Sequence, residues 1–495
     1  MSQIKTEVLI IGGGIGGAAI ARELSKYKVD ATLVEKGPDV GQGITKCSST
    51  IMCQGSNVLE FRSEYHNSRL VWAGMTMMEP LCKELDIPLK RIGSLELIKN
   101  QEEMRHPEKM MRRFKEYKGK YIPDEVEPLQ FIDRDTLRSW EPNVNKSYLG
   151  ALYDPNIAVN DPVRLTIALA DNARKNGIKV LLDTEVMSIS KGTDEFEVCT
   201  NNGSIKCRYI INAAGEYVGK IAQMADADDF ALYPVKSYQA VLDKKLGGII
   251  NHMVLSNENG MVAPTIHGNL FFGISPGTQR LGKAHDHSTD KKLADAALKN
   301  AQELVPGISE RDITNSFVGF IVFRNFEIGW HECTVGVSRW VPRFINASIG
   351  FPGICAAPAV AKEMIDILRN QGLQLTENPD FDPYEKSMPD FSELSDEEKR
   401  QIIAKDPKYG HVVCRCETVT EGEIVEAIKR GARTLDGVKF RCRPGMGRCQ
   451  GGFCGPRVTK ILARELGISE EEVTKKGGES RNLLYKSKEL LEAQQ

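Results

Sequence analysis

The chain begins with short apolar runs that alternate with an amphipathic stretch. Residues 7–11 (EVLII) form an apolar run with the length of a buried parallel strand. Residues 18–24 have the spacing of an amphipathic helix, and residues 31–34 form a second apolar run. This order predicts a β-α-β unit at the start of the chain, as found in open α/β sheets.

Later segments repeat the same two patterns. Residues 164–176 are helix-like, and residues 180–186 are a strand candidate. Residues 209–212 predict another strand that ends at a small-residue turn, and residues 354–368 predict another helix. We expect these segments to belong to the same domain as the N-terminal unit, which would make that domain discontinuous in sequence.

Two short helices are predicted near the C-terminus. Residues 420–423 (TEGE) form a capping box, and apolar residues follow at inward spacing. Residues 458–466 carry apolar side chains at the spacing of a second helix. The stretch before them holds four prolines and many charges, which is typical of a linker.

A glycine-rich turn joins the first predicted strand to the first helix. Gly12, Gly14 and Gly17 meet the spacing G-x-G-x-x-G. Such glycines permit a tight turn, a close approach to a pyrophosphate and close packing of helix on strand. Glu35 ends the second strand 18 residues after Gly17, where a carboxylate can hydrogen-bond ribose hydroxyls. These residues predict a dinucleotide site without a 2′-phosphate, and they leave FAD and NAD equally open.

Composition narrows the class of protein. A chain of 495 residues is longer than one core of about 250–300 residues, so several domains are expected. The formal net charge of −2 gives no reason to expect nucleic acid or an anionic membrane surface. No apolar run approaches the roughly 20 residues that span a bilayer. We therefore predict a cytoplasmic protein with no transmembrane segment and no nucleic-acid partner.

Five of the twelve cysteines lie between residues 414 and 454. Cys414 and Cys416 are spaced C-x-C, whereas Cys449 and Cys454 are spaced C-x₄-C, so four thiolates are available to one compact metal site. Zinc and a [2Fe–2S] cluster both accept four thiolates, although these spacings depart from the common C-x₂-C of zinc sites. Cys442 stands outside the pairs and is predicted to be a nearby structural thiol.

Four further segments carry a family resemblance. Residues 445–457 (GMGRCQGGFCGPR) are the most specific, and residues 91–95, 264–270 and 475–480 add to them. With the glycine turn, they resemble the FAD-dependent oxidoreductases of the D-amino-acid oxidase superfamily. The likeness is strongest to the anaerobic glycerol-3-phosphate dehydrogenase-like group with a fused bacterioferritin-associated-ferredoxin-like domain. The resemblance implies noncovalent FAD and a [2Fe–2S] cluster on the four paired cysteines.

The resemblance also implies which residues contact the flavin. The stretch after Glu35 is rich in small and hydroxyl side chains that can lie close to a flat ring. A helix start near residue 353 can aim N–H groups at the pyrimidine edge of the flavin. Beside the glycines and Glu35, the predicted cofactor-binding residues are Lys46, Ser48, Ser49, Val186, Gly215 and Gly353.

Two positions depart from the pattern of the relatives. Many relatives carry His-x-Gly near the flavin, where this chain has Cys53-Gln-Gly55. An arginine that often holds substrate phosphate or carboxylate is replaced by Ile321, and the nearest arginine is Arg324. These departures concern the substrate more than the cofactor.

The predicted reaction is oxidation of a CH–OH group by hydride transfer to FAD. Glycerol 3-phosphate is the leading small-molecule substrate. A 2-hydroxy acid such as 2-hydroxyglutarate, or an amino or imino acid, is the enzymatic alternative. An electron-transfer flavoprotein without a small-molecule substrate is the alternative from another class. No general base is assigned by the sequence.

The predicted fold class is α/β: a Rossmann-like FAD domain with an inserted α+β substrate domain and a small C-terminal helical iron–sulfur domain. The expected electron acceptor is a redox protein or a quinone-linked subunit, and any peripheral membrane position would come through that partner. The predicted boundaries are 1–372 for the oxidoreductase, with its FAD domain at about 1–90, 150–220 and 340–370, then 373–407 for a linker, 408–470 for the [2Fe–2S] domain and 471–495 for a tail.

Overall fold

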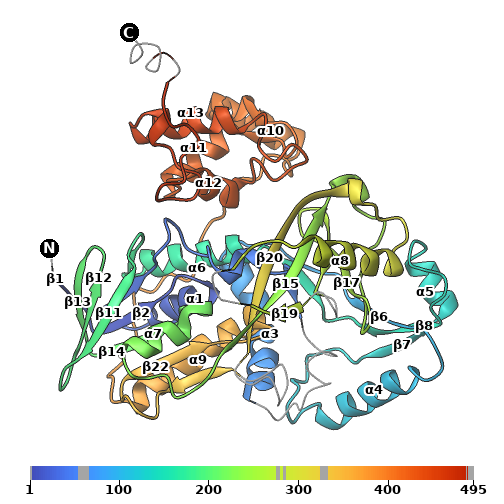
Figure 1. The fold of residues 1–495 in the computed structure, drawn as a ribbon, viewed down its shortest axis with the longest axis horizontal. Coiled ribbons are helices and arrows are strands. Elements are labelled where there is room, and N and C mark those ends of the chain that lie inside the picture. Colours follow the sequence, from blue (N-terminus) through green and yellow to red (C-terminus); the bar gives the residue numbers. More distant parts are fainter. Residues whose placement is uncertain are drawn as a thin grey trace. The chain divides into compact units, whose positions relative to one another are not determined.

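The computed structural model describes residues 3–53, 66–274, 279–282, 286–323, 333–486 and 488. The chain divides into two compact units. The first comprises residues 1–35 and 40–385, and the second comprises residues 36–39 and 386–495. The boundary near residue 385 lies inside the segment that the sequence predicts to be a linker. Figure 1 colours the chain from its N-terminus in blue to its C-terminus in red.

A six-stranded sheet carries the glycine turn of the first unit (Figure 1). Its strand order is β10-β3-β2-β14-β22-β21, and all neighbours are parallel except β21, which pairs antiparallel at the edge. The strands come from three separate parts of the chain. The apolar runs predict strands in the first two parts, whereas β21 and β22 of the third part were not predicted. Their bounds are β2 (Val8–Ile11), β3 (Ala31–Val34), β10 (Lys179–Leu181), β14 (Tyr209–Asn212), β21 (Thr334–Val337) and β22 (Phe344–Ser348).

Helices pack beside this sheet. Helix α1 packs against α6 and α9, and α3 also packs against α9. The predicted helices at 164–176 and 354–368 are present as α6 and α9. The strand predicted at 180–186 is wrong in its extent, because the chain turns at Asp183, which has a φ of 51°, and two different strands flank that turn. The helix bounds are α1 (Ile15–Leu24), α3 (His66–Glu84), α6 (Pro162–Lys175), α7 (Val218–Met224) and α9 (Gly353–Asn370).

Two smaller sheets flank the six-stranded one. A four-stranded sheet has the order β1-β13-β12-β11, and a three-stranded sheet has the order β4-β9-β5. Apolar side chains of the four-stranded sheet share a buried core with β2, β3 and β14. The strands are β1 (Gln3–Lys5), β4 (Ile51–Met52), β5 (Leu89–Arg91), β9 (Ala158–Asn160), β11 (Val186–Lys191), β12 (Phe196–Thr200) and β13 (Gly203–Cys207).

A nine-stranded, mostly antiparallel sheet forms the inserted part of the first unit. It follows the order β19-β15-β18-β17-β16-β6-β8-β7, and β20 pairs with β15. Strand β8 belongs to this sheet, so the predicted FAD-domain segment 150–220 begins too early. The strands are β6 (Ser94–Ile98), β7 (Gln130–Asp133), β8 (Gly150–Asp154), β15 (Tyr233–Leu242), β16 (Met253–Ser256), β17 (Gly260–Pro264), β18 (Leu270–Gly273), β19 (Gln279–Leu281) and β20 (Ile313–Phe323).

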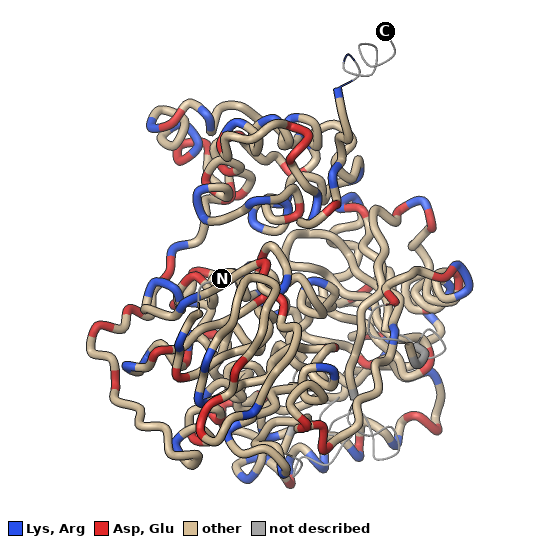
Figure 2. Tube along the Cα trace, turned by 60° about the vertical axis from the view of Figure 1, so that its left-hand side comes forward, with Lys and Arg blue, Asp and Glu red and all other residues tan. Residues whose placement is uncertain are grey.

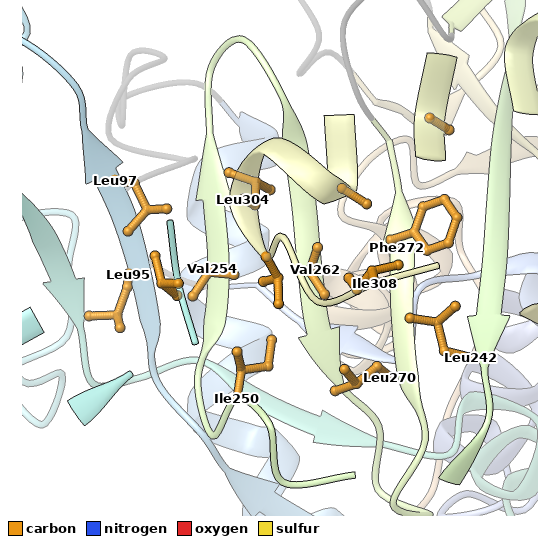
Figure 3. Close-up of a cluster of buried hydrophobic side chains, with 14 of the residues drawn as sticks. Leu95, Leu97, Leu242, Ile250, Val254, Val262, Leu270, Phe272, Leu304 and Ile308 are labelled. Atoms are coloured by element: carbon orange, nitrogen blue, oxygen red, sulfur yellow. The ribbon is translucent and has the colours of Figure 1, made fainter. Parts of the chain in front are cut away.

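The core of this inserted part lies between the sheet and helix α8 (Lys291–Leu304). Figure 3 shows Leu95, Val254, Val262 and Leu270 from neighbouring strands together with Leu304 from the helix. All five side chains are fully buried. Short helices complete the insert: α4 (Arg105–Tyr117), α5 (Arg134–Trp140), η3 (Lys244–Leu246) and η4 (Glu310–Asp312).

The second unit is small and mainly helical. The capping box predicted at Thr420 opens α11, and a helix covers the apolar positions predicted at 458–466. The helix α12 between the cysteine pairs was not predicted. The elements of the second unit are α10 (Asp396–Lys405), η5 (Pro407–Gly410), β23 (Val412–Cys414), β24 (Val419–Thr420), α11 (Glu421–Lys429), α12 (Leu435–Cys442), α13 (Gly455–Leu466) and η6 (Glu470–Glu472).

The ends of the second unit differ from the predicted boundaries. Helix α10 lies within the predicted linker 373–407, and its capping box at Ser395 explains why that charged segment is helical. Val473, in the predicted tail, is buried in the same core as Ile424 and Leu462. Basic and acidic positions are interspersed along the trace of both units (Figure 2).

Candidate functional site

The glycine turn leaves no room for side chains at two of its three signature positions. Gly12 has a φ of +107°, and a Cβ there would lie 2.6 Å from the carbonyl oxygen of Ala213. A Cβ on Gly17 would lie 1.9 Å from the carbonyl oxygen of Gly12. The turn therefore brings the end of β2, the start of α1 and the end of β14 into backbone contact, as the motif requires.

The N-terminus of α1 is open to a ligand at this turn. Gly14 is its N-cap residue, with extended backbone and no side-chain cap. The N–H of Gly13 donates to Glu35 Oε2 at 2.7 Å, and the N–H of Ile15 donates to Thr45 Oγ1 at 3.1 Å. These two N–H groups are occupied within the chain, but the N-cap Gly14 supplies no side chain to the other N–H groups of the first turn, and such a helix N-terminus favours phosphate. Thr45 was not predicted; only its place in the hydroxyl-rich stretch pointed to it.

Gly215 and Val186 lie near this turn in different roles. Gly215 begins η2 (Gly215–Tyr217) with a φ of +57°, and a Cβ there would meet Ile44 Cδ1 at 3.9 Å. Val186 is the first residue of β11, and its buried side chain packs in the core with Val34. Gly215 therefore lies just beyond the carboxyl end of β14, whereas the side chain of Val186 belongs to the core.

The starts of α1 and α9 meet at one residue, Ile349. A Cβ on Gly16 would lie 2.7 Å from Ile349 Cδ1, and a Cβ on Gly353 would lie 3.8 Å from Ile349 Cβ. Gly353 is the first residue of α9, after Pro352 at the N-cap with no side-chain cap. Two positive helix ends are thus available to one elongated anionic ligand.

The stretch after η1 (Ile44–Cys47) collects buried polar atoms. Among the described residues, Ser48 Oγ, Thr50 Oγ1 and both amide atoms of Asn160 are buried without a hydrogen-bond partner. Thr50 has a φ of 64°, which is strained for a β-branched residue. Of the other two predicted residues, Lys46 reaches Gln42 Oε1 at 3.5 Å, and Ser49 is half-buried. Most buried polar groups are hydrogen-bonded, so this group fits a polar ligand.

The opposite wall comes from the nine-stranded sheet. Within the described part of the chain, Ser237 Oγ and Gln239 Oε1 on β15 are also buried without a partner. Ser237 pairs with Gly319 of β20. A Cβ on Gly319 would lie 2.5 Å from Gln239 Nε2 and 2.7 Å from the carbonyl oxygen of Cys47. Side chains alternate along a strand, so Ser237, Gln239 and Gly319 share the face that meets η1. We use the name interdomain pocket for the residues Ser48, Thr50, Asn160, Ser237, Gln239 and Gly319, which carry these buried polar atoms or lie at the contact between β20 and η1.

Of the two positions that depart from the family pattern, Ile321 lies on the pocket side of β20. Ile321 shares the face of Gly319, because it lies two residues further along β20. Cys53 is buried near Cys355. The pKa of the Cys355 thiol lies well above its usual value, mainly because Cys355 is buried and to a lesser extent because Cys53 is close. Gln54, Gly55 and Arg324 lie outside the described residues. The thiol of Cys47 stays protonated at neutral pH, since burial raises its pKa to about 11.

Two histidines of the first unit, His267 and His66, are held by carboxylates. His267 Nε2 lies 2.9 Å from Asp161 Oδ2, and Asp161 is the N-cap of α6. His66 Nε2 lies 2.8 Å from Glu363 Oε2, and the hydrogen bonds with Cys333 and Glu363 raise its pKa to about 10. Each imidazole is thus positioned by a carboxylate, and neither contact assigns the general base.

The four paired cysteines gather in the second unit as two pairs. Cys416 Sγ and Cys449 Sγ are 3.8 Å apart. The thiol of Cys454 hydrogen-bonds Cys414 and, with the backbone N–H of Gly445, lowers the pKa of Cys414 to about 6. Such thiolate stabilisation suits a metal ligand.

The two thiol pairs fit one of the two metal centres that the sequence left open. Among the described residues, no three His, Cys, Asp or Glu side chains come close enough to hold a single metal ion. A [2Fe–2S] cluster places two cysteines on each of two irons, so two thiol pairs fit such a cluster. Cys442 ends α12 and donates to the carbonyl oxygen of Val438 at 3.4 Å, which fits its predicted structural role.

Comparison with known families decides the class. Residues 7–367 match the family described as FAD dependent oxidoreductase. The chain belongs to the FAD-dependent oxidoreductases. Residues 412–464 of this oxidoreductase match the BFD-like [2Fe-2S] binding domain. The predicted fold class and both predicted cofactors, FAD and a [2Fe–2S] cluster, are thereby confirmed.

The oxidoreductase has relatives along nearly its whole length. It is 36% identical over 477 residues to a protein of Caloramator mitchellensis named glycerol 3-phosphate dehydrogenase, covering 95% of this chain and 96% of the relative. It is 24% identical to anaerobic glycerol-3-phosphate dehydrogenase subunit A1 of Haloferax volcanii, covering 92% of this chain and 83% of the relative.

A solved structure shares the fold of the first unit. L-α-glycerophosphate oxidase from Mycoplasma pneumoniae, with FAD bound, superposes with a TM-score of 0.69 at 26% identity, covering 79% of this chain and 100% of that chain. The glycine turn and the two helix starts at Ile349 fit a bound FAD, because they offer backbone donors with no side chain in the way. In the described ranges, none of the helices combines the length and the apolar character that a membrane span requires.

Proposed function

We propose that this FAD-dependent oxidoreductase oxidises the CH–OH group of glycerol 3-phosphate and passes the electrons through its [2Fe–2S] domain to a partner protein. The observation that carries this proposal is the 36% identity to a glycerol 3-phosphate dehydrogenase over 95% of the chain. The relative is covered over 96% of its own length, so the likeness includes both units.

The first unit would hold the cofactor through backbone and one carboxylate. The open turn at Gly12, Gly14 and Gly17 supports a pyrophosphate at the start of α1. Glu35, held by the N–H of Gly13, is in place for ribose hydroxyls. The start of α9 at Gly353 would supply its positive end to the flavin. When bound, FAD supplies an acceptor for a hydride from the substrate carbon.

The interdomain pocket would orient the flavin and the substrate. Ser48 Oγ and Thr50 Oγ1 come from the flavin side, and Ser237 Oγ and Gln239 Oε1 come from the inserted sheet. Leaving a buried polar group without a partner costs about 1–3 kcal/mol, so each of these atoms favours a ligand that satisfies it. The close approach of Gly319 to Cys47 would exclude water from this side of the pocket.

The second unit would carry electrons away from the pocket. Cys414, Cys416, Cys449 and Cys454 would hold the [2Fe–2S] cluster, which supplies one-electron transfer. The relative from Haloferax volcanii is named as a subunit, which supports a multi-protein arrangement for this chain as well. We propose a further redox protein or a quinone-linked subunit as the acceptor, with a cytoplasmic location.

Ile321 favours a second candidate substrate. An aliphatic side chain at this position of β20 offers no charge to a phosphate, and the thiol of Cys53 replaces the imidazole of many relatives. A 2-hydroxy acid such as 2-hydroxyglutarate, or an amino or imino acid, would then take the place of glycerol 3-phosphate. Both candidates use the same hydride transfer and the same pocket.

A turnover assay separates the candidates. The holoenzyme is mixed anaerobically with an artificial electron-accepting dye and with glycerol 3-phosphate, 2-hydroxyglutarate, glycine or proline in turn. We expect the highest kcat/KM with glycerol 3-phosphate. A higher kcat/KM with one of the acids would identify that acid, and not glycerol 3-phosphate, as the substrate. If none of these compounds is turned over but a reduced partner protein still reduces the flavin, the result would favour an electron-transfer flavoprotein.

A further inference from the structure

An aromatic side chain stands exposed inside the cysteine loop of the second unit. Phe453 is 83% exposed, the largest value among the large apolar side chains that the structure describes. It directly precedes Cys454, so it lies beside a predicted cluster ligand. Exposing a phenyl ring stabilises nothing in the unit itself, whereas aromatic side chains are common anchors in protein interfaces.

The two cysteine loops carry a one-sided charge. Residues 414–418 and 443–457 contain four arginines and a single carboxylate, Glu417. Glu417 is 3% exposed in its side chain and forms an ion pair with Arg443 at 3.1 Å. The other three arginines, Arg415, Arg448 and Arg457, are exposed. The outer surface of the loops is therefore basic.

One of the two thiol pairs lies toward this basic surface. Cys414 and Cys454 are 1% and 2% exposed, whereas Cys416 is exposed and Cys449 is half-buried. Gly447 permits the loops to meet there, because a Cβ on it would lie 2.3 Å from Cys416 Cβ. The edge of a cluster held by these pairs would thus reach solvent between Phe453 and the arginines.

We propose that Arg415, Cys416, Arg448, Phe453 and Arg457 form a docking surface for an acidic one-electron carrier protein. We name these residues the cluster-edge surface. Charge complementarity steers an acidic partner to it, and Phe453 anchors the complex. One electron leaves the chain and reduces the carrier, with no bond broken and no proton moved. The inference rests on the proposed electron relay but not on the identity of the substrate.

The test uses two haem proteins as probes. The holoenzyme is reduced anaerobically with dithionite, desalted and mixed in a stopped-flow instrument with acidic cytochrome b5 or with basic cytochrome c. Each electron that leaves the enzyme converts one ferric haem to ferrous haem. We expect faster reduction of cytochrome b5, with a rate that falls as salt is added. Equal or faster reduction of cytochrome c at low salt would overturn the proposal.

Variants locate the docking site. We expect Phe453→Ser to slow the reduction of cytochrome b5 about tenfold, whereas Phe453→Leu retains most of the rate. The double change Arg415→Glu and Arg457→Glu is expected to slow cytochrome b5 by a similar factor and to accelerate cytochrome c. Lys429→Glu, an exposed charge reversal on α11 of the same unit, is the control and should leave both rates within about twofold.

Two other roles of these residues would give different results. If Phe453 contacts the flavin-binding unit of its own chain, Phe453→Ser will slow electron transfer from flavin to cluster and leave the cytochrome b5 step unchanged. If the arginines only balance the charge of the cluster, their replacement will shift its reduction potential and leave docking unchanged. Either result would overturn the proposal. Dithionite replaces the substrate in the cytochrome reactions, so a wrong substrate assignment does not affect them.

Discussion

The glycine turn and the interdomain pocket are built in opposite ways. The turn uses neighbours in sequence, since Gly12, Gly14 and Gly17 lie in one short stretch and Glu35 follows on the next strand. The pocket joins Ser48, Asn160 and Gln239, which come from three distant segments. Backbone sterics specify the turn, whereas the pairing of β20 with β15 and its contact with η1 specify the pocket.

Breaking the turn should have the largest effect. Gly17→Ala places a Cβ 1.9 Å from the carbonyl oxygen of Gly12, and backbone must move to relieve it. We expect loss of FAD and destabilisation by about 3 kcal/mol or more, since overpacking of this kind exceeds what side chains absorb. The measurements are the flavin content of the purified protein and its thermal unfolding. Gly219→Ala is the control, because no atom lies within 4 Å of its added Cβ; equal loss of FAD in both variants would contradict the account.

The cysteine loops extend the comparison, because they too are local motifs. Cys454→Ser removes one thiol from the buried pair with Cys414, and we expect loss of iron and sulfide with FAD retained. Cys442→Ser is the matched control, since its thiol bonds Val438 within α12. Iron, acid-labile sulfide and flavin analysis of both variants measures the result. If Cys442→Ser lost the cluster and Cys454→Ser kept it, the assigned ligands would be wrong.

Gly319→Ala should separate the pocket from the turn. Its Cβ would lie 2.5 Å from Gln239 Nε2 and 2.7 Å from the carbonyl oxygen of Cys47, so η1 and β20 must move apart. We expect FAD to remain bound and kcat/KM to fall by about 10- to 100-fold, as for small misplacements of reacting groups. Gly307→Ala, with no atom within 4 Å of its Cβ, should retain full activity. Undiminished kcat/KM in Gly319→Ala would place the reaction elsewhere.

The smallest expected effect comes from Asp161, which caps α6 beside the pocket strand β9. Burial is the largest single effect and favours the neutral form, but the hydrogen bond and charge of His267, together with Arg164, outweigh it and lower the pKa of Asp161 to about 2. The folded value lies below the unfolded value of about 3.9, so the stabilisation is present above pH ~4 and is lost as the pH falls toward 2. Asp161→Ala should cost about 1–2 kcal/mol at pH 7, measured by thermal unfolding.

The pH dependence provides the control for that prediction. The difference in stability between the wild-type protein and Asp161→Ala should shrink as the pH falls below 4. Asp161→Asn retains an acceptor for the N–H groups of Val163 and Arg164 and should cost less. A difference that is constant down to pH 3 would mean that the ionised carboxylate contributes nothing.

The parts that sequence predicted well are those with local physical causes. Gly12 and Gly17 have no substitute at their positions, and the capping box at Thr420 fixes the start of α11 by its own side chains. Ser237 and Gln239 carried no such signal, because a polar residue in a strand is ordinary until its partner strand and facing loop are known. Helix α12 was missed for a similar reason: its buried positions are few, and its N-cap Thr434 lies in a loop without a capping box.

We propose that one chain binds FAD and a [2Fe–2S] cluster and that glycerol 3-phosphate reduces both cofactors. An anaerobic titration of the holoenzyme with glycerol 3-phosphate, followed by visible absorbance, tests it most directly. We expect bleaching of the flavin, followed by loss of iron–sulfur absorbance. An unchanged spectrum, in a protein whose two cofactors dithionite still reduces, would contradict it.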